Sequence, residues 1–364
     1  MTPSLELIAA TSAHDAALRQ LLRETPVAGL LRVTLEREPS FFGADFDVTQ
    51  HDVALVLQLG QAVACGSRVL RRVCWNGSEQ EVAYLSDLRL HPNFQKRVGR
   101  ALLGGYRLLE KCARQHPAAA TWTAVFESNT VAQTTLVGGR AGLPDYANRG
   151  RLICPLLLVK RRHPEPAGSI CVRACAADLP EITLFLQQNL APRPLAPYVA
   201  DLDLMHGRRW PDLQANDFIM ARRGPEILGV VAVRDLRRYK QVRVVETPWL
   251  WRMAKFPSQL VAALNLAPAL PIPGQVLPIG FASFLTVKND DVALTRMLLQ
   301  AAAALASRKG LSFLSTAFHE SDPKSTATRE LPALETDGIL YQVLQGAQNA
   351  NWTAATPYID PANL

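Results

Sequence analysis

Apolar positions along this chain alternate as in strands or recur at helical spacing, and the same order of elements is expected twice. In the first half these elements are expected at 5–9, 15–22, 53–59, 61–69, 84–90, 100–116 and 121–126. The second half repeats the order at 170–174, 178–186, 218–221, 227–234, 280–287, 291–308 and 312–318. In each half a strand enters a long helix, which leads to another strand. The repeat predicts an α/β protein with two copies of one fold, each a mixed twisted sheet flanked by helices.

A polar segment with two prolines, 160–169, is the best candidate for a boundary between the copies. We therefore expect domains at 1–162 and 170–364, joined by a linker at 163–169. A length of 364 residues suits two such domains. The second copy also carries an additional segment, 239–277, which contains Trp249 and Trp251. Its pattern fits a lid, a dimer surface or a cover for the core.

Composition narrows the class of protein. The net charge of +7 is spread over small arginine clusters without interleaved aromatic residues, which argues against a nucleic-acid partner. The six cysteines include no Cys-x-x-Cys pair and have no histidine at ligand spacing, so we expect reduced packing residues and no metal. No apolar stretch is long enough to span a bilayer, and no signal peptide is evident. These features predict a cytoplasmic protein without a membrane partner.

The junction between the strand at 84–90 and the following helix has the features of an anion site. Gly99 lies where a basic loop enters the helix, and Lys96, Arg97 and Arg100 surround it. The first turn of a helix leaves backbone N–H groups unpaired and pointing in one direction. These donors, the helix dipole and the basic side chains predict a seat for a phosphate or pyrophosphate.

This junction resembles the GNAT acetyltransferase superfamily, in which a strand is followed by Gln/Arg-x-x-Gly-x-Gly/Ala and a helix. The resemblance implies acetyl-CoA or another acyl-CoA as co-substrate, held through the strand and the loop. The implied cofactor-binding residues are Leu88, Arg89, Leu90, Gln95, Lys96, Arg97, Val98, Gly99, Arg100 and Ala101. The loop is one residue shorter than the family pattern and lacks its first glycine.

A second match follows at 121–126, where a strand leads to Asn129 and Ala132. Family members often have Asn-x-x-Ala at this point, and the resemblance implies that Asn129 reaches the cofactor; Ser128 or Asn129 can also cap the helix. The stretches 140–146 and 151–159 resemble a bacterial subgroup with two GNAT domains in tandem. The second copy is expected to be degenerate, because its junction at 287–291 has no glycine and carries Asp290 and Asp291. Either aspartate suits a helix cap, and both repel a polyanion.

The side chains that would move protons are less well defined. Asp87 and Glu127 are the nearest candidates for a general base, although Asp87 can pair with Arg89 and Glu127 can favour a helix dipole. Leu136 stands where the family often has a catalytic tyrosine. Tyr146 or Tyr106 can supply the acid instead, or can be packing residues.

The acceptor is expected in a cleft between the strand at 84–90 and the region 26–42, with the second domain as a further candidate for its wall. Within that region, 35–42 resembles the acceptor-side helix of the tandem subgroup, where Glu36 and Glu38 can orient an amine or form a solvated face. The chain is thus predicted to transfer an acetyl or longer acyl group from CoA to a primary amine of a small molecule or peptide. The alternative is a non-catalytic sensor that binds CoA or another ligand. A homodimer is left open.

Overall fold

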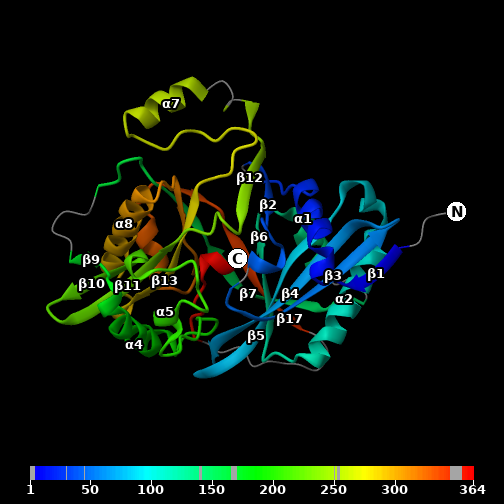
Figure 1. The fold of residues 1–364 in the computed structure, drawn as a ribbon, viewed down its shortest axis with the longest axis horizontal. Coiled ribbons are helices and arrows are strands. Elements are labelled where there is room, and N and C mark those ends of the chain that lie inside the picture. The colour runs from blue at the N-terminus through cyan, green and yellow to red at the C-terminus, as the bar shows by residue number, and fades with distance from the viewer. Residues whose placement is uncertain are drawn as a thin grey trace.

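The computed structural model describes residues 5–29, 31–44, 46–138, 142–164, 170–249, 251, 255–344 and 355–364. Within these ranges the chain forms two large sheets, each with helices on both faces (Figure 1). The fold class expected from the sequence is confirmed.

The first sheet contains eight strands. Along the sheet these are β1 (Leu5–Ala9), β3 (Val48–Gln58), β4 (Gln61–Trp75), β5 (Ser78–Leu90), β6 (Thr121–Phe126), β17 (Gly338–Leu344), β7 (Asp145–Ile153) and β15 (Phe318–His319). Helix α1 (Asp15–Glu24) buries its leucines against Val53 and Leu55. Helix α2 (Val98–Gln115) covers the other face, where Gly105 approaches Ala54.

Packing explains the first of the two glycines inside α2. A Cβ at Gly104 would lie 3.0 Å from Leu7 Cδ2, so the absence of a side chain lets the helix sit close to β1. A Cβ at Gly105 would make an ordinary contact of 3.8 Å with Ala54 Cβ, and packing does not require glycine there.

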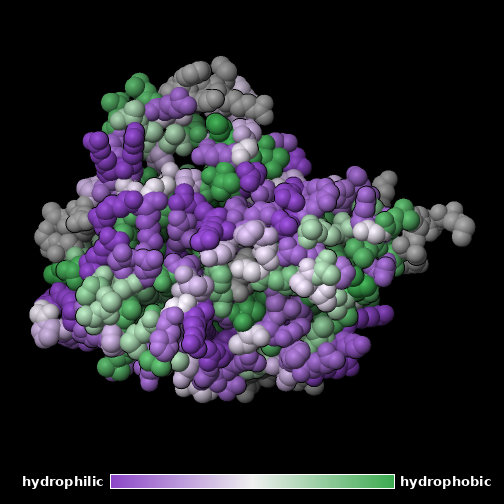
Figure 2. Space-filling view, viewed as in Figure 1, coloured by the Kyte–Doolittle hydropathy of each residue, from purple (hydrophilic) through white to green (hydrophobic). Residues whose placement is uncertain are grey.

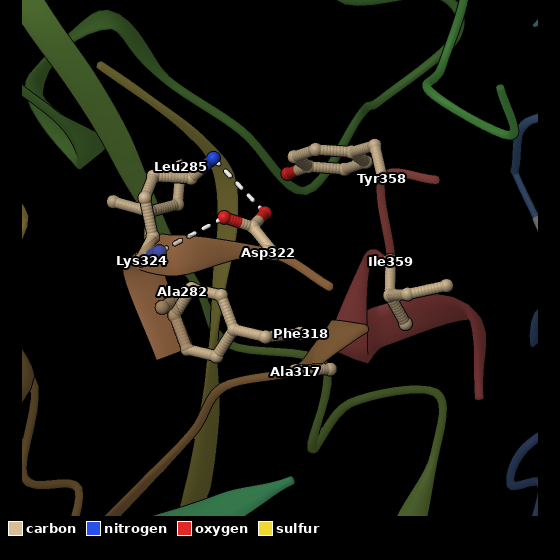
Figure 3. A pocket seen from close by; sticks show the side chains of 8 residues that line it. All are labelled: Ala282, Leu285, Ala317, Phe318, Asp322, Lys324, Tyr358 and Ile359. Atoms are coloured by element: carbon tan, nitrogen blue, oxygen red, sulfur yellow. Dashed lines mark hydrogen bonds and ion pairs between the residues drawn. The ribbon is translucent and has the colours of Figure 1, made fainter. Parts of the chain in front are cut away.

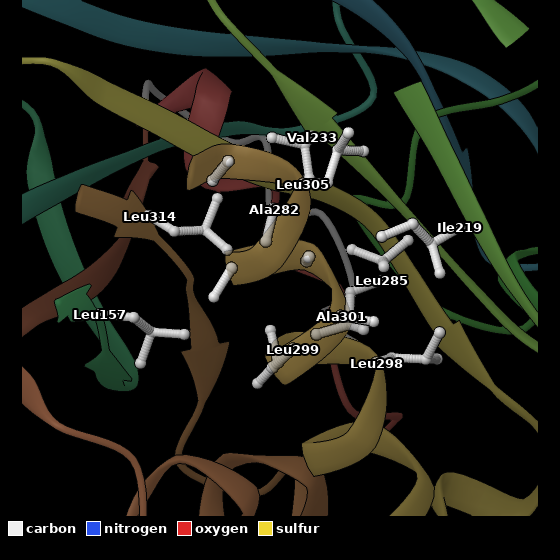
Figure 4. Packing of buried hydrophobic residues seen from close by; sticks show 14 of the residues in the cluster. Leu157, Ile219, Val233, Ala282, Leu285, Leu298, Leu299, Ala301, Leu305 and Leu314 are labelled. Atoms are coloured by element: carbon white, nitrogen blue, oxygen red, sulfur yellow. The ribbon is translucent and has the colours of Figure 1, made fainter. Parts of the chain in front are cut away.

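The second sheet contains seven strands. In order these are β16 (Ala333–Glu335), β8 (Pro155–Leu158), β14 (Phe313–Ser315), β13 (Ile279–Val287), β11 (Glu226–Arg234), β10 (Phe218–Arg223) and β9 (Cys171–Arg173). Helix α8 (Val292–Arg308) packs on the face that carries Ile219 and Val233 (Figure 4). Helix α4 (Leu179–Leu190) packs on the opposite face, and the short α5 (Asp203–His206) lies beside it.

The sheets exchange strands. β8 comes from the first half of the chain but pairs with β14 and β16. β17 comes from the second half but pairs with β6 and β7 (Figure 1). The two sheets therefore do not coincide with the two halves of the sequence. The division at 163–169 stays a prediction, and residues 165–169 lie outside the described residues.

A two-stranded ribbon joins the halves further. β2 (Arg32–Glu36) pairs antiparallel with β12 (Gln241–Glu246), and helix α7 (Lys255–Ala263) projects beyond this ribbon (Figure 1). The additional segment thus contributes a strand to the connection between the halves. The projection carries exposed leucines at 260, 264 and 266, and hydrophobic side chains are visible on it in Figure 2.

The helix expected within 35–42 is wrong. Residues 32–36 are a strand, because β12 supplies a pairing partner about 200 residues away, with Leu35 opposite Val242. Glu36 is only 4% exposed and binds Arg243, while Glu38 binds Arg19 and Arg23. These carboxylates are therefore engaged within the protein and do not form a solvated helix face.

Among the described residues, none of the helices has both the length and the apolar character needed to cross a bilayer.

Candidate functional site

The central feature of the first sheet is a pair of parallel strands that separate. β5 and β6 pair only at Ala83 with Thr121 and at Tyr84 with Trp122. Beyond that point β5 keeps its partner β4 on one side, and β6 keeps β17 on the other. We call the space between residues 85–90 and 123–126 the first fork. One edge of β5 backbone faces this space.

A bulge in β5 helps to open the first fork. Asp87 has a φ of 51°, and the register with β4 shifts between Cys65 and Ser67. The Cys65 thiol donates to the Asp87 carbonyl at 3.3 Å. The side chain of Asp87 accepts a bond of 2.7 Å from Arg37 Nη2, and both side chains are about nine-tenths buried. The ion pair of Asp87 is thus with Arg37, whereas Arg89 Nη1 donates to the Leu88 carbonyl.

The open end of the first fork leads to a helix N-terminus. β5 ends at Leu90, a 3₁₀ turn spans Pro92–Arg97, and α2 begins at Val98. Gly99 is exposed, and a Cβ added there would meet no heavy atom of the described residues within 4 Å. Open space therefore lies beside the first turn, where backbone N–H groups lack helical partners.

The other predicted cofactor residues divide into three groups. Leu88 is 42% exposed, whereas Leu90 and Ala101 pack against Val56 and Val63. Leu90 and Ala101 thus use their side chains in the core, and Leu90 is also paired with Ala64 of β4. A final group lies outside the part of the chain whose side chains are described: Gln95, Lys96, Arg97, Val98 and Arg100.

β6, the second strand of the first fork, is followed by a capped helix. Asn129 Oδ1 accepts a bond of 3.1 Å from the Ala132 N–H and caps α3 (Thr130–Ala132), so the predicted cap is confirmed. The cap leaves the Asn129 amide group as a donor. A π-helical turn follows at Gln133–Val137, a distortion that is frequent at functional sites. The loop before β2 approaches here, since a Cβ on Gly29 would lie 4.0 Å from Ser128 Oγ.

Glu127 and Tyr146 belong to separate networks. Glu127 is exposed and pairs with Arg151 at 3.0 Å, and Arg151 also pairs with Asp337. The Tyr146 hydroxyl shares a hydrogen bond with that of Tyr106, and burial raises the pKa of both phenols. The structure therefore brings Asp87 to the bulge of the first fork but gives Glu127 and Tyr146 partners of their own.

Two residues near this site were missed from the sequence. Tyr341 donates to Gln133 Oε1 at 2.7 Å, and its ring lies edge-on to that of Tyr146 at 6.0 Å. The Gln133 amide nitrogen is buried without a partner among the described residues. Tyr341 lies on β17, which arrives about 200 residues after Gln133, so no local signal in the sequence connects them.

The second sheet has a corresponding fork that the protein fills itself. β13 and β14 pair at three positions and then separate, and Phe284 takes a φ of 56° as Asp87 does. Tyr358, Asp322 and Lys324 line a cavity of about 10 Å³ there, roughly the room of one water molecule (Figure 3). Asp291 caps α8 by accepting from the Leu294 N–H, which confirms the expected cap.

Asp290 has a structural role at the same junction. Its carboxylate binds Arg193 and lies 2.8 Å from Lys324 Nζ. Burial opposes ionisation of Asp290, but Lys324 and Arg193 more than offset it, so its pKa lies below the ordinary value. A charged carboxylate therefore occupies the end of the second fork.

Among the described residues, no three His, Cys, Asp or Glu side chains come together as a group that could hold a metal ion.

The fold is shared with known acyltransferases. Saccharomyces cerevisiae N-myristoyltransferase with bound myristoyl-CoA matches with a TM-score of 0.60 over 94% of this chain and 83% of that chain, at 9% identity. A GCN5-related N-acetyltransferase from Sphaerobacter thermophilus matches with a TM-score of 0.56 over 96% and 98%, at 14% identity. No family model and no curated protein matches the sequence. The chain thus has the fold of GNAT N-acyltransferases.

Proposed function

We propose that this protein is an N-acyltransferase that moves an acetyl or other acyl group from CoA to a primary amine of a small molecule or peptide. The observation that carries the proposal is the contrast between the forks. The first fork is open beside Gly99, at the N-terminus of α2, whereas the second holds Tyr358 and a charged Asp290. The similarity to acyltransferase structures supports the same reaction class.

In this proposal the cofactor follows β5. Backbone N–H groups at 98–100 and the charges of Lys96, Arg97 and Arg100 hold the diphosphate. The main chain of Leu88, Arg89 and Leu90 holds the pantetheine arm, and the Asn129 amide donates to it. These contacts orient the thioester, and positioning of this kind can supply much of the rate.

The reaction requires a neutral amine and a stabilised oxyanion. The amine nitrogen attacks the thioester carbonyl, the carbon–sulfur bond breaks, and the thiolate takes up a proton. We assign the oxyanion to a backbone N–H near Leu88 and the base to Asp87, which Arg37 holds in place at the bulge. Glu127 as an alternative base and Tyr146 as the acid also stay proposals.

The second candidate function is a sensor that binds CoA or another ligand without transfer. It is favoured by one observation: Asp87, Glu127 and Tyr146 all bind partners within the protein. A cytoplasmic location and a homodimer stay predictions under either function.

Calorimetry with acetyl-CoA, combined with a thiol-release assay over a panel of amines, tests the proposal. We expect saturable binding of acetyl-CoA and release of CoA thiol with at least one amine. Binding without thiol release from any amine would support the sensor. If neither acetyl-CoA nor CoA binds, the transferase is contradicted, and so is a sensor of CoA.

A further inference from the structure

The projection beyond the β2–β12 ribbon is uncharged, apolar and exposed. Residues 258–275 contain no charged side chain, and we call them, together with Trp249, the apolar tip. Leu260, Leu264 and Leu266 are 60–63% exposed, and Trp249 is 70% exposed. α7 stands away from both sheets (Figure 1), and hydrophobic side chains are visible on the projection in Figure 2. Single exposed apolar residues are ordinary in proteins, whereas a group of them marks an interaction site.

A basic segment is fixed at the base of the apolar tip. Asn265, which lies between two exposed leucines, accepts from the Arg162 N–H at 2.7 Å and donates to the Arg162 carbonyl at 2.9 Å. The Arg161 carbonyl accepts from Ser307 Oγ, near the end of α8, at 2.8 Å. The side chains of Arg161 and Arg162 are exposed and form no ion pair or hydrogen bond with another described residue. Two uncompensated positive charges therefore accompany the exposed leucines.

This combination suits a lipid surface with negative charge. Apolar side chains can enter the boundary between headgroups and acyl chains, where tryptophan is also favoured, while arginines pair with anionic headgroups. A projecting tip enters a fluid lipid layer without needing a groove of matching shape. A second copy of the chain is a poorer partner, because a two-fold contact through the tip brings Arg161 and Arg162 of both copies together.

We propose that the apolar tip docks this protein reversibly on an anionic lipid surface. The apolar residues and the two arginines supply the two attractions, hydrophobic and electrostatic, that surface docking combines. The sequence-based expectation of no membrane partner came from the absence of a spanning stretch, and docking on a surface needs no such stretch. The inference does not depend on the proposed acyl transfer.

Co-sedimentation of the full chain with lipid vesicles tests this inference. The probes are phosphatidylcholine vesicles with and without about one-third phosphatidylserine. We expect at least about tenfold tighter binding to the vesicles that contain phosphatidylserine, and weaker binding to them at high salt, because salt screens exposed charges.

Two double variants separate the two attractions. Leu264→Asp with Leu266→Asp should weaken binding about tenfold or more, because carboxylates replace side chains that enter the lipid. Arg161→Gln with Arg162→Gln should weaken binding roughly fivefold per arginine on the phosphatidylserine vesicles and leave the weak binding to neutral vesicles unchanged.

Matched controls make the same chemical changes elsewhere on the surface. Leu184 on α4 and Leu202 beside α5 are more than half exposed, so Leu184→Asp with Leu202→Asp matches the leucine variant. Arg223 and Arg329 are exposed, and Arg223→Gln with Arg329→Gln matches the loss of charge. We expect both controls to bind vesicles within about twofold of the unmodified protein, since the tip and the basic segment are intact.

Each remaining outcome overturns the proposal. The unmodified protein fails to bind either kind of vesicle, or the tip variants bind as tightly as the unmodified protein while circular dichroism shows them folded. Sedimentation velocity adds a third outcome: a dimer that the leucine variant dissociates, without vesicle binding, would show that a second copy covers the tip. The vesicle measurements and the acetyl-CoA calorimetry are separate, so failure of one leaves the other conclusion standing.

Discussion

Two buried carboxylates where the sheets meet have pKa values shifted in opposite directions. Burial opposes ionisation of Asp47, but Arg71, 3.0 Å away, together with Arg234 and Arg209, more than offsets it and lowers the pKa. Burial also opposes ionisation of Asp360, and here Arg234, Ser283 and the Ala362 N–H do not offset it, so the pKa is raised. The ionised carboxylate of Asp47 thus stabilises the fold at neutral pH, whereas that of Asp360 destabilises it.

Asp47→Asn and Asp360→Asn should therefore change stability differently. The contribution of Asp47 is present above the unfolded pKa of about 4 and is lost as pH falls through the lower folded pKa, so Asp47→Asn should cost about 3–5 kcal/mol near pH 7. The contribution of Asp360 is present below that pKa and is lost as pH rises through the raised folded pKa. Asp360→Asn should therefore be neutral or stabilising near pH 7, because an amide oxygen can still accept from Ser283.

Urea unfolding between pH 4 and pH 8 measures both effects. Each variant is a control for the other, since both remove one buried carboxylate and keep its shape. Similar losses of stability in the two variants at pH 7 would contradict the assignment.

Gly99→Asp should weaken binding of acetyl-CoA while the protein stays folded. A Cβ at this position meets no heavy atom of the described residues within 4 Å, so we expect the fold to tolerate the side chain. The added carboxylate opposes a diphosphate at the helix N-terminus, and we expect the dissociation constant to rise by about tenfold or more. Gly99→Ala is the control, with the same added Cβ and no charge. Calorimetry that gives the aspartate variant an unchanged affinity would place the cofactor elsewhere.

Contacts between residues close in the sequence could be predicted, whereas contacts between distant residues could not. The caps at Asn129 and Asp291 were predictable because each cap accepts from an N–H three residues later. The partner of Asp87 was not predictable, because Arg37 lies 50 residues away, directly after β2, in a stretch that was expected to be helical. The ring contact between Tyr84 and Trp122 was likewise not predictable, because it depends on the pairing of β5 with β6.

At the scale of elements, continuous patterns were the most informative. The strand at 121–126 and the helix expected at 291–308, observed at 292–308, follow directly from spacing and caps. The helix expected within 35–42 was wrong because Val33 and Leu35 alternate over only a few residues, and β12 supplies their cross-strand partners. Short strands take their identity from such partners, which a local pattern does not contain.

The second fork should not bind CoA even when its junction is given a glycine. Asn289 has a φ of 55°, which glycine adopts easily, so Asn289→Gly should fold normally. Tyr358 and the Asp290–Lys324 pair still occupy the space. We expect calorimetry to give one acetyl-CoA per chain for both the unmodified protein and this variant. A stoichiometry of two in the variant would show that the glycine alone limits the second site.

At the scale of the whole molecule, the sequence predicts the repeated order of elements but not the exchange of strands between the two sheets. An apolar strand pattern at 155–158 or 338–344 is the same whether the strand joins its own half or the other. Only the pairing of β8 with β14 and of β17 with β6 reveals the exchange. Two halves that share strands in this way are expected to unfold together.

This arrangement makes the predicted domain of residues 1–162 testable as a fragment. Alone, it lacks β17, so the edges of β6 and β7 that β17 covers are exposed and prone to aggregation. It also carries β8 without the partners β14 and β16. We expect the fragment to be unfolded or aggregated by circular dichroism and light scattering, and not to bind acetyl-CoA. Co-expression with residues 163–364 should restore a folded complex that binds it, because each fragment returns the strand that the other sheet lacks. A fragment that folds alone and binds acetyl-CoA as tightly as the full chain would instead show that the first fork needs nothing from the second half.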